Sequence, residues 1–160
     1  MALGILEYKN WTFEVDKELT KQTYENVESG GSDTCTCSNC QNYVAFRENV
    51  FPNEIRNLFE DIGIDYKKEV EVTELEKLPN GLHHISGWFH FKGKLVTGED
   101  CKVASPQGGF IINLTKILEN FSIGFSKGND LTFFNDKDHL VQVEFDTNIP
   151  WIIDKKLEDS

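Results

Sequence analysis

The sequence predicts an α+β fold: a mostly antiparallel, sandwich-like β-sheet with two short helices packed on one face. Three observations favour this class. Apolar residues recur with helical spacing chiefly between residues 39 and 62. Most of the chain that follows consists of short segments in which apolar and polar residues alternate, as in half-buried strands. Regular alternation of strands and helices, which would predict a parallel sheet, is absent.

Length and composition predict a single domain over residues 1–160. A chain of 160 residues can bury a self-sufficient hydrophobic core without disulfides or a metal ion. Aromatic residues make up 12% of the chain, too many for a disordered acidic protein. No repeat with a period of about 20–50 residues interrupts this organisation.

The first strand is predicted between Gly4 and Asp16, where Trp11, Phe13 and Val15 alternate with polar neighbours. A polar stretch follows and ends in the sequence SGGSD at residues 29–33, the most loop-like run in the chain. The segment before this run is too short to form a domain of its own. We therefore expect the first strand to join the same sheet as the later ones.

Two helices are predicted at about residues 39–48 and 52–62. Ser38 and Gln41 form a capping box at the start of the first. The second begins at a proline, as helices often do, and Gly63 ends it. Its apolar residues form one stripe with the spacing i, i+3, i+4, i+7: Ile55, Leu58, Phe59 and Ile62.

The rest of the chain is predicted to consist of strands and turns. Residues 70–72 alternate, and residues 82–96 form one long strand or two. Within that segment, residues 88–91 are aromatic on both faces, as expected of a central strand covered on both sides. Further strands are predicted at 110–114, 121–125, 130–134, 139–145 and 149–153.

One cysteine motif carries chemistry: C-x-C-x-x-C at Cys35, Cys37 and Cys40, directly before the first predicted helix. Thiolates are ligands that zinc, copper(I) and iron–sulfur clusters favour. A tetrahedral site needs a fourth ligand, and Cys101, which follows a turn, is the first candidate. The alternative fourth ligands are His83, His84 and His90. The pattern thus predicts a metal site, with zinc as the expected ion.

Two other interpretations of the cysteines remain open. They are either reduced thiols that pack as small apolar groups, or one of them is reactive. In the second case Cys40 would be a thiolate stabilised by the helix dipole, with Cys37 as the resolving thiol. A thioredoxin-like site would require a preceding strand, which the sequence does not predict. The first residues do not resemble a secretory signal, so structural disulfides are not expected and the predicted location is cytoplasmic.

The charge distribution bears on partners. The net charge is −11, and residues 1–33 carry −4, residues 34–129 carry −2 and residues 130–160 carry −5. Such acidity argues against a nucleic-acid partner and against binding to an anionic membrane surface. We interpret the acidic ends as solvated faces. A protein partner, held by the acidic surface or by the aromatic strand around Trp88, stays an open alternative.

Three segments resemble a group of small, uncharacterised bacterial proteins: CTCSNCQNY (35–43), GWFHFKGK (87–94) and VQVEFDTNIPW (141–151). That group has a cysteine-rich start to its first helix and a Pro-Trp pair after its last strand. The resemblance covers most of the chain and implies a bacterial, cytoplasmic, single-domain protein. It carries no catalytic residue.

The sequence therefore favours a small cytoplasmic binding or interaction module with a structural zinc at the C-x-C-x-x-C segment. The alternative is a thiol-dependent redox protein or other enzyme that uses Cys40. The common nucleotide-binding, hydrolase and metalloprotease motifs are absent, so no catalytic residue is predicted.

Overall fold

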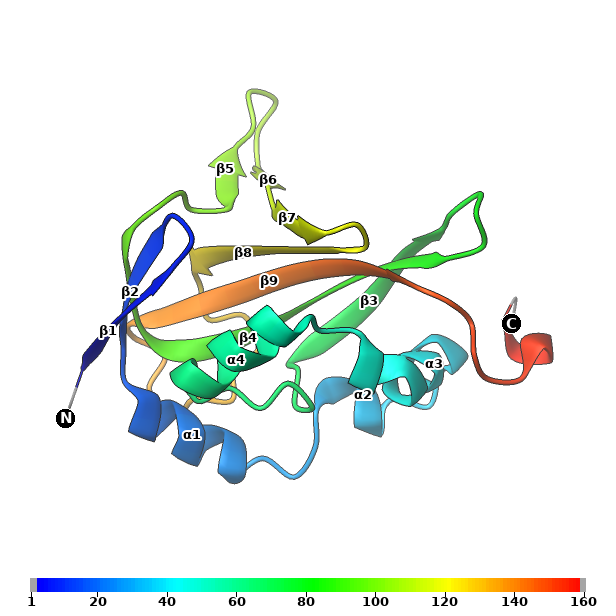
Figure 1. Cartoon of the computed structure of the whole chain (residues 1–160), viewed down its shortest axis with the longest axis horizontal. Helices are drawn as coiled ribbons and strands as arrows, with labels where there is room; N and C mark the ends of the chain where they lie inside the picture. The colour runs from blue at the N-terminus through cyan, green and yellow to red at the C-terminus, as the bar shows by residue number, and fades with distance from the viewer. Residues whose placement is uncertain (1–2, 159–160) are drawn as a thin grey trace.

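The computed structural model describes residues 3–158, and it confirms an α+β fold dominated by antiparallel sheet (Figure 1). The strands are β1 (Gly4–Tyr8), β2 (Trp11–Val15), β3 (Glu71–Lys77), β4 (His83–Thr97), β5 (Lys102–Ala104), β6 (Phe110–Ile112), β7 (Thr115–Leu118), β8 (Phe121–Lys127) and β9 (Leu140–Ile149). The helices are α1 (Lys17–Glu25), α2 (Gly31–Thr34), α3 (Ser38–Phe46) and α4 (Asn53–Ile62), with short 3-10 turns at Arg47–Asn49 and Lys155–Leu157.

Strand β4 organises the seven-stranded sheet, whose order is β1-β2-β4-β9-β8-β7 with β3 also paired to β4. Along one edge of β4, residues 83–88 pair with β3 and residues 93–97 pair with β2. Along the other edge, β9 pairs with residues 83–92. Strands β5 and β6 form a separate hairpin that projects from the sheet at the top of Figure 1.

Helix α1 fills the gap that β3 and β2 leave on their shared edge of β4. The Tyr24 hydroxyl donates to the His90 carbonyl (2.8 Å) and accepts from the His90 amide (3.0 Å). The Thr20 hydroxyl accepts from the Lys92 amide (3.0 Å), and the Asp16 amide donates to the Lys92 carbonyl (2.8 Å). Because buried backbone groups need partners, these contacts replace the missing strand.

The hydrophobic core lies between the helices and one face of the sheet, which we call the inner face. Its centre is the Phe51 ring, whose centroid lies 5.1–5.8 Å from those of four other phenylalanines. These are Phe59 of α4, Phe89 of β4, Phe121 of β8 and Phe145 of β9. The apolar stripe predicted for α4 is fully buried against this cluster. Of the aromatic residues predicted for the central strand, Phe89 and Phe91 therefore belong to the core.

The opposite, outer face of β4 is covered by the loop between β8 and β9. Trp88 donates from its indole nitrogen to the Asp130 carbonyl (3.0 Å), and the Lys92 ammonium contacts the Asp136 carboxylate (3.0 Å). The strand predicted at 130–134 belongs to this loop. Phe134 is buried there and its ring faces Tyr24, whereas Leu131 is exposed, so the segment packs beside the sheet without joining it.

Other boundaries also differ from the predictions. The first predicted strand is a hairpin of β1 and β2. Strand β9 covers the strand predicted at 139–145 and continues to Ile149, and residues 150–153, predicted as a strand, are not one. Helices α1 and α2 were not predicted, because α1 buries only Thr20 and Tyr24 and has no apolar stripe, and α2 has only four residues. Within residues 3–158 no helix has the length and apolar character that a membrane crossing requires.

Candidate metal centre

The structure brings three of the four predicted ligands together. The sulfur atoms of Cys35, Cys37 and Cys40 all lie within 4.8 Å of one another, at the N-terminal end of α3. The Cys35 and Cys37 sulfurs are 3.2 Å apart. The Cys40 amide donates to the Cys37 sulfur (3.4 Å), so Cys37 is the N-cap of the helix. Over residues 3–158, no other group of three or more Cys, His, Asp or Glu side chains is close enough to share an ion.

The segment before the cysteines is anchored by a buried carboxylate. Glu69 is fully buried and accepts from the Ser32 amide at the start of α2 (3.1 Å). Arg47, beyond α3, pairs with both Glu69 (3.3 Å) and Asp33 (3.2 Å). Burial raises the pKa of Glu69, although Arg47 opposes that shift. The loop is therefore held at both ends by one ion-pair network, and the three sulfurs lie between these anchors.

Helix α3 is also fixed to the end of the sheet. The Asn42 side chain donates to the Pro150 carbonyl (3.0 Å) and accepts from the Ile152 amide (2.8 Å), which ties the helix to the chain that leaves β9. One turn earlier, the side-chain nitrogen of Asn39 donates to the Glu74 carboxylate of β3 (3.0 Å). Two asparagines thus set the position of the helix whose first turn carries Cys40.

Two carboxylates that the sequence did not single out lie beside the sulfurs. A cavity of about 340 Å³ is lined by the three cysteines and by a short stretch of β3 that includes Glu71 and Glu74. Glu74 already contacts Asn39 and His83. The Glu71 carboxylate has no hydrogen-bond or ion-pair partner among the described residues. It is near enough to Cys35 to raise that thiol's pKa. Because strand pairing alone brings β3 to this position, no local signal in the sequence could have identified these residues.

The three thiols have different electrostatic environments. Hydrogen bonds from its cysteine neighbours lower the pKa of Cys35, which is half-exposed. Burial raises the pKa of Cys40 well above the ordinary thiol value, and contacts with Cys35 and Cys37 raise it further. Without a metal ion, Cys40 is therefore protonated at neutral pH, which argues against its use as a reactive thiolate.

Cys101 lies apart from the other three cysteines. Its amide donates to the Phe125 carbonyl of β8 (2.9 Å), and its carbonyl accepts from the Asn113 amide (2.7 Å). Its side chain packs against Gly124 and Leu114. It is buried, and burial raises its pKa to about 12. The structure does not bring Cys101 to the three-sulfur cluster, because it lies beside β8, which β4 and β9 separate from β3.

The histidines proposed as alternative ligands have other partners. His83 is buried between the carboxylates of Glu74 and Glu158. Its Nε2 atom lies 2.8 Å from a carboxylate oxygen of Glu158. His84 contacts Asp146 (3.3 Å), and His90 contacts Gln142 (2.9 Å). None of the three belongs to the sulfur cluster. The alternation of β4 explains this distribution, since neighbouring side chains point to opposite faces.

Comparison of the chain with known protein families, with curated protein sequences and with solved structures finds no match. The interpretation of the site therefore depends on its own geometry: three converging thiols at the start of a helix, with a free carboxylate beside them.

Proposed function

We propose that the protein is a small binding module in which Cys35, Cys37 and Cys40 hold a structural zinc ion. The observation that carries this proposal is the convergence of the three sulfurs within 4.8 Å. Thiolates bound to a tetrahedral zinc at about 2.3 Å are about 3.8 Å from one another, so only small shifts would be needed to accommodate the ion. Binding would require loss of the Cys40 proton and would therefore weaken as the pH falls.

A structural role for the ion is supported by what it would connect. The three cysteines link the loop after α2 to the first turn of α3, beside the edge strand β3. Glu71 is the side chain best placed to supply the fourth ligand, since both oxygens of Glu74 already have partners. A water molecule is the other ligand that would complete the site. Reduced thiols are essential in either case, so the proposal includes a reducing compartment such as the cytoplasm.

The first test is zinc stoichiometry, which can be measured by elemental analysis of protein purified without a nickel column. We expect about one zinc ion per chain in the wild type and none in Cys37→Ser. Cys101→Ser is the matched control, because it removes a buried thiol outside the cluster, and it should keep its zinc. Full zinc content in Cys37→Ser would refute the assignment. Loss of zinc in Glu71→Gln would identify the fourth ligand.

The second test is chelation combined with thiol titration of the native protein. A chelator should lower the melting temperature of the wild type and make the three clustered thiols react faster, while it should leave Cys37→Ser unaffected. Cys101 should stay slow in both proteins because it is buried. One fast thiol that does not respond to the chelator would instead favour a reactive cysteine. Four slow, unresponsive thiols would favour simple packing.

A further inference from the structure

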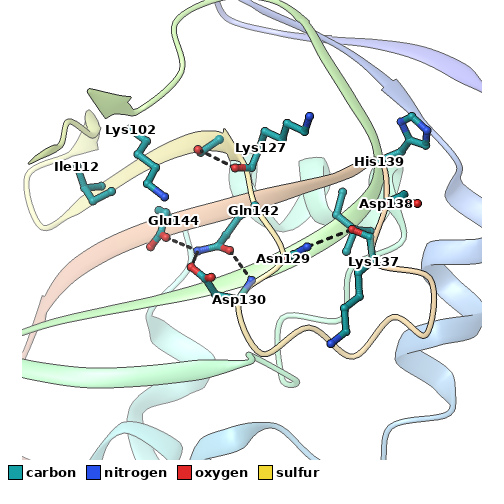
Figure 2. A pocket seen from close by; sticks show the side chains of 13 residues that line it. Lys102, Ile112, Lys127, Asn129, Asp130, Lys137, Asp138, His139, Gln142 and Glu144 are labelled. Carbon is teal, nitrogen blue, oxygen red and sulfur yellow. Dashed lines mark hydrogen bonds between the residues drawn. The ribbon is translucent and has the colours of Figure 1, made fainter. Parts of the chain in front are cut away.

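A cavity larger than the one beside the cysteines lies on the outer face of the sheet. Its volume is about 740 Å³, within the range of small-molecule sites. Four parts of the chain build it, as Figure 2 shows: the β5–β6 hairpin, the end of β8, the β8–β9 loop and strand β9. Lys102 and Ile112, paired neighbours in the hairpin, overhang the floor that Gln142 and Glu144 form. We call this the outer-face cavity.

Its floor is held by one glutamine with a full set of hydrogen bonds. The Gln142 side-chain oxygen accepts from His90 Nε2 (2.9 Å) and from the Asp130 amide (3.1 Å). Its nitrogen donates to Glu144 (2.6 Å) and to the Asp130 carboxylate (3.4 Å). Gln142 is only 5% exposed. A buried amide with all its partners in place has one orientation, so the two carboxylates are presented in a preorganised arrangement.

These carboxylates favour a cationic group between them. Both contact the same Gln142 nitrogen. Burial raises the pKa of Glu144, and the charge of Asp130 adds to the shift, although Gln142 and Lys102 oppose it. An ammonium group from a ligand would reduce the repulsion between the two acids. No Lys or Arg side chain forms an ion pair with either of them within the described part of the chain.

The lining of the same cavity also carries lysines that form no ion pair among the described residues. Lys102, Lys127 and Lys137 line it, and among residues 3–158 none has a carboxylate within 4.0 Å. The Lys102 ammonium instead lies over the Phe110 ring, 4.7 Å from its centroid. Three acids, Asp130, Asp138 and Glu144, share the lining with these lysines. Ile112 and Leu140 add apolar surface to the lining.

We propose that the outer-face cavity binds a small aliphatic zwitterion, the chemistry of a free amino acid or a dipeptide. Asp130 and Glu144 would hold the ammonium, Lys102 the carboxylate, and Ile112 and Leu140 the aliphatic part. A ligand with only negative charge would meet the acidic floor, and a ligand with only positive charge would leave the lysines uncompensated. The proposal does not depend on zinc, since none of these residues touches the cysteine cluster.

The test is a titration of the protein with L-leucine or L-leucyl-L-leucine, the two zwitterionic probes, monitored by ¹H–¹⁵N NMR. Saturable shifts should appear at residues 127–130 and 137–144, with a Kd near or below about 1 mM for at least one probe. The tighter of the two identifies whether an amino acid or a dipeptide fits better. Two comparators lack one charge each: 3-methylbutylamine has no carboxylate, and 4-methylpentanoate has no ammonium. Each should bind about tenfold more weakly than the better zwitterion.

Two variants and a control complete the experiment. Glu144→Gln and Lys102→Gln should each weaken the zwitterion about tenfold, since each removes one charged partner and keeps a side chain of similar size. Lys116→Gln, an exposed position on β7 outside the cavity, should bind like the wild type. The same spectra report whether each variant is folded. Absence of saturable shifts with both probes up to about 20 mM, or equal binding of a singly charged comparator, would overturn the proposal.

Discussion

The cysteine cluster and the outer-face cavity differ in where their residues come from. All three sulfurs belong to one six-residue segment, so their proximity is largely a local property. The cavity gathers side chains from four segments that lie up to 42 residues apart, between Lys102 and Glu144. The cluster depends on how its loop is anchored to the rest of the protein, whereas the cavity depends on strand register and packing. Mutations should therefore affect the two sites through different contacts.

The largest expected effect comes from the anchor of the cysteine loop. Arg47→Met leaves Glu69 buried without its ion-pair partner, and we expect a loss of about 3–5 kcal/mol in the free energy of unfolding. Lys67→Met is the control, because its pair with Glu48 is exposed and should contribute less than about 1 kcal/mol. Urea unfolding measures both. If the cysteine cluster depends on this anchor, Arg47→Met also loses zinc. Equal losses of stability in Arg47→Met and Lys67→Met would contradict this dependence.

The next effect concerns the packing that holds the hairpin over the cavity. A β-carbon at position 124 would lie 2.6 Å from the Cys101 β-carbon and 2.8 Å from a Leu114 methyl group. Gly124→Ala should therefore lower the free energy of unfolding by about 1–3 kcal/mol and displace the segment that carries Lys102. Ser122→Ala, two residues earlier on the same face, is the control and should be close to neutral. Unchanged stability in Gly124→Ala would show that this packing can relax. Zinc content should not change in either variant.

A pH-dependent effect should follow from the floor of the cavity. Because the pKa of Glu144 is raised in the folded protein, the folded state holds this proton more tightly than the unfolded chain. The resulting stabilisation is present below the unfolded pKa of about 4.3 and is lost as the pH rises through the folded pKa. Relative to Glu144→Gln, the wild type should therefore lose stability over that range.

Urea unfolding at several pH values from about 4 upward measures this difference. Glu119→Gln, at an exposed position, should follow the wild type at every pH. Parallel curves for the wild type and Glu144→Gln would contradict the prediction.

The smallest expected effect concerns the end of the described chain. Burial alone would lower the pKa of His83, but hydrogen bonds to Glu158 and Glu74 outweigh it and raise the pKa. The stability that this adds is present below the unfolded pKa of about 6.5 and is lost as the pH rises through the folded pKa. Glu158→Gln should reduce this dependence of the melting temperature on pH. Glu76→Gln, exposed on β3, should preserve it, and an unchanged slope in Glu158→Gln would count against the role of this contact.

Local patterns were good predictors where the chain makes local contacts. The apolar stripe of α4 is buried as its spacing predicts. Helix α3 begins within one residue of its predicted start, but its N-cap is Cys37 and not Ser38 of the predicted capping box. The pattern misled at residues 130–134, which form a loop in which Phe134 is buried and Leu131 is exposed. Helix α1 escaped prediction because its two buried side chains, Thr20 and Tyr24, act through hydroxyl groups that complete the edge of β4. Hydropathy carries no signal for that role.

What the sequence by itself determined is the set of three thiols, because two short spacings and a helix start suffice to bring their sulfurs together. It also determined the amphipathic helix on which the core is built. Only the tertiary structure decided that Glu71 lies beside the sulfurs and that Cys101 does not. Only the register of β9 against β4 places Gln142 opposite His90, and with it the floor of the outer-face cavity. The reason is physical: strand pairing joins residues far apart in the chain, and no local pattern specifies which ones meet.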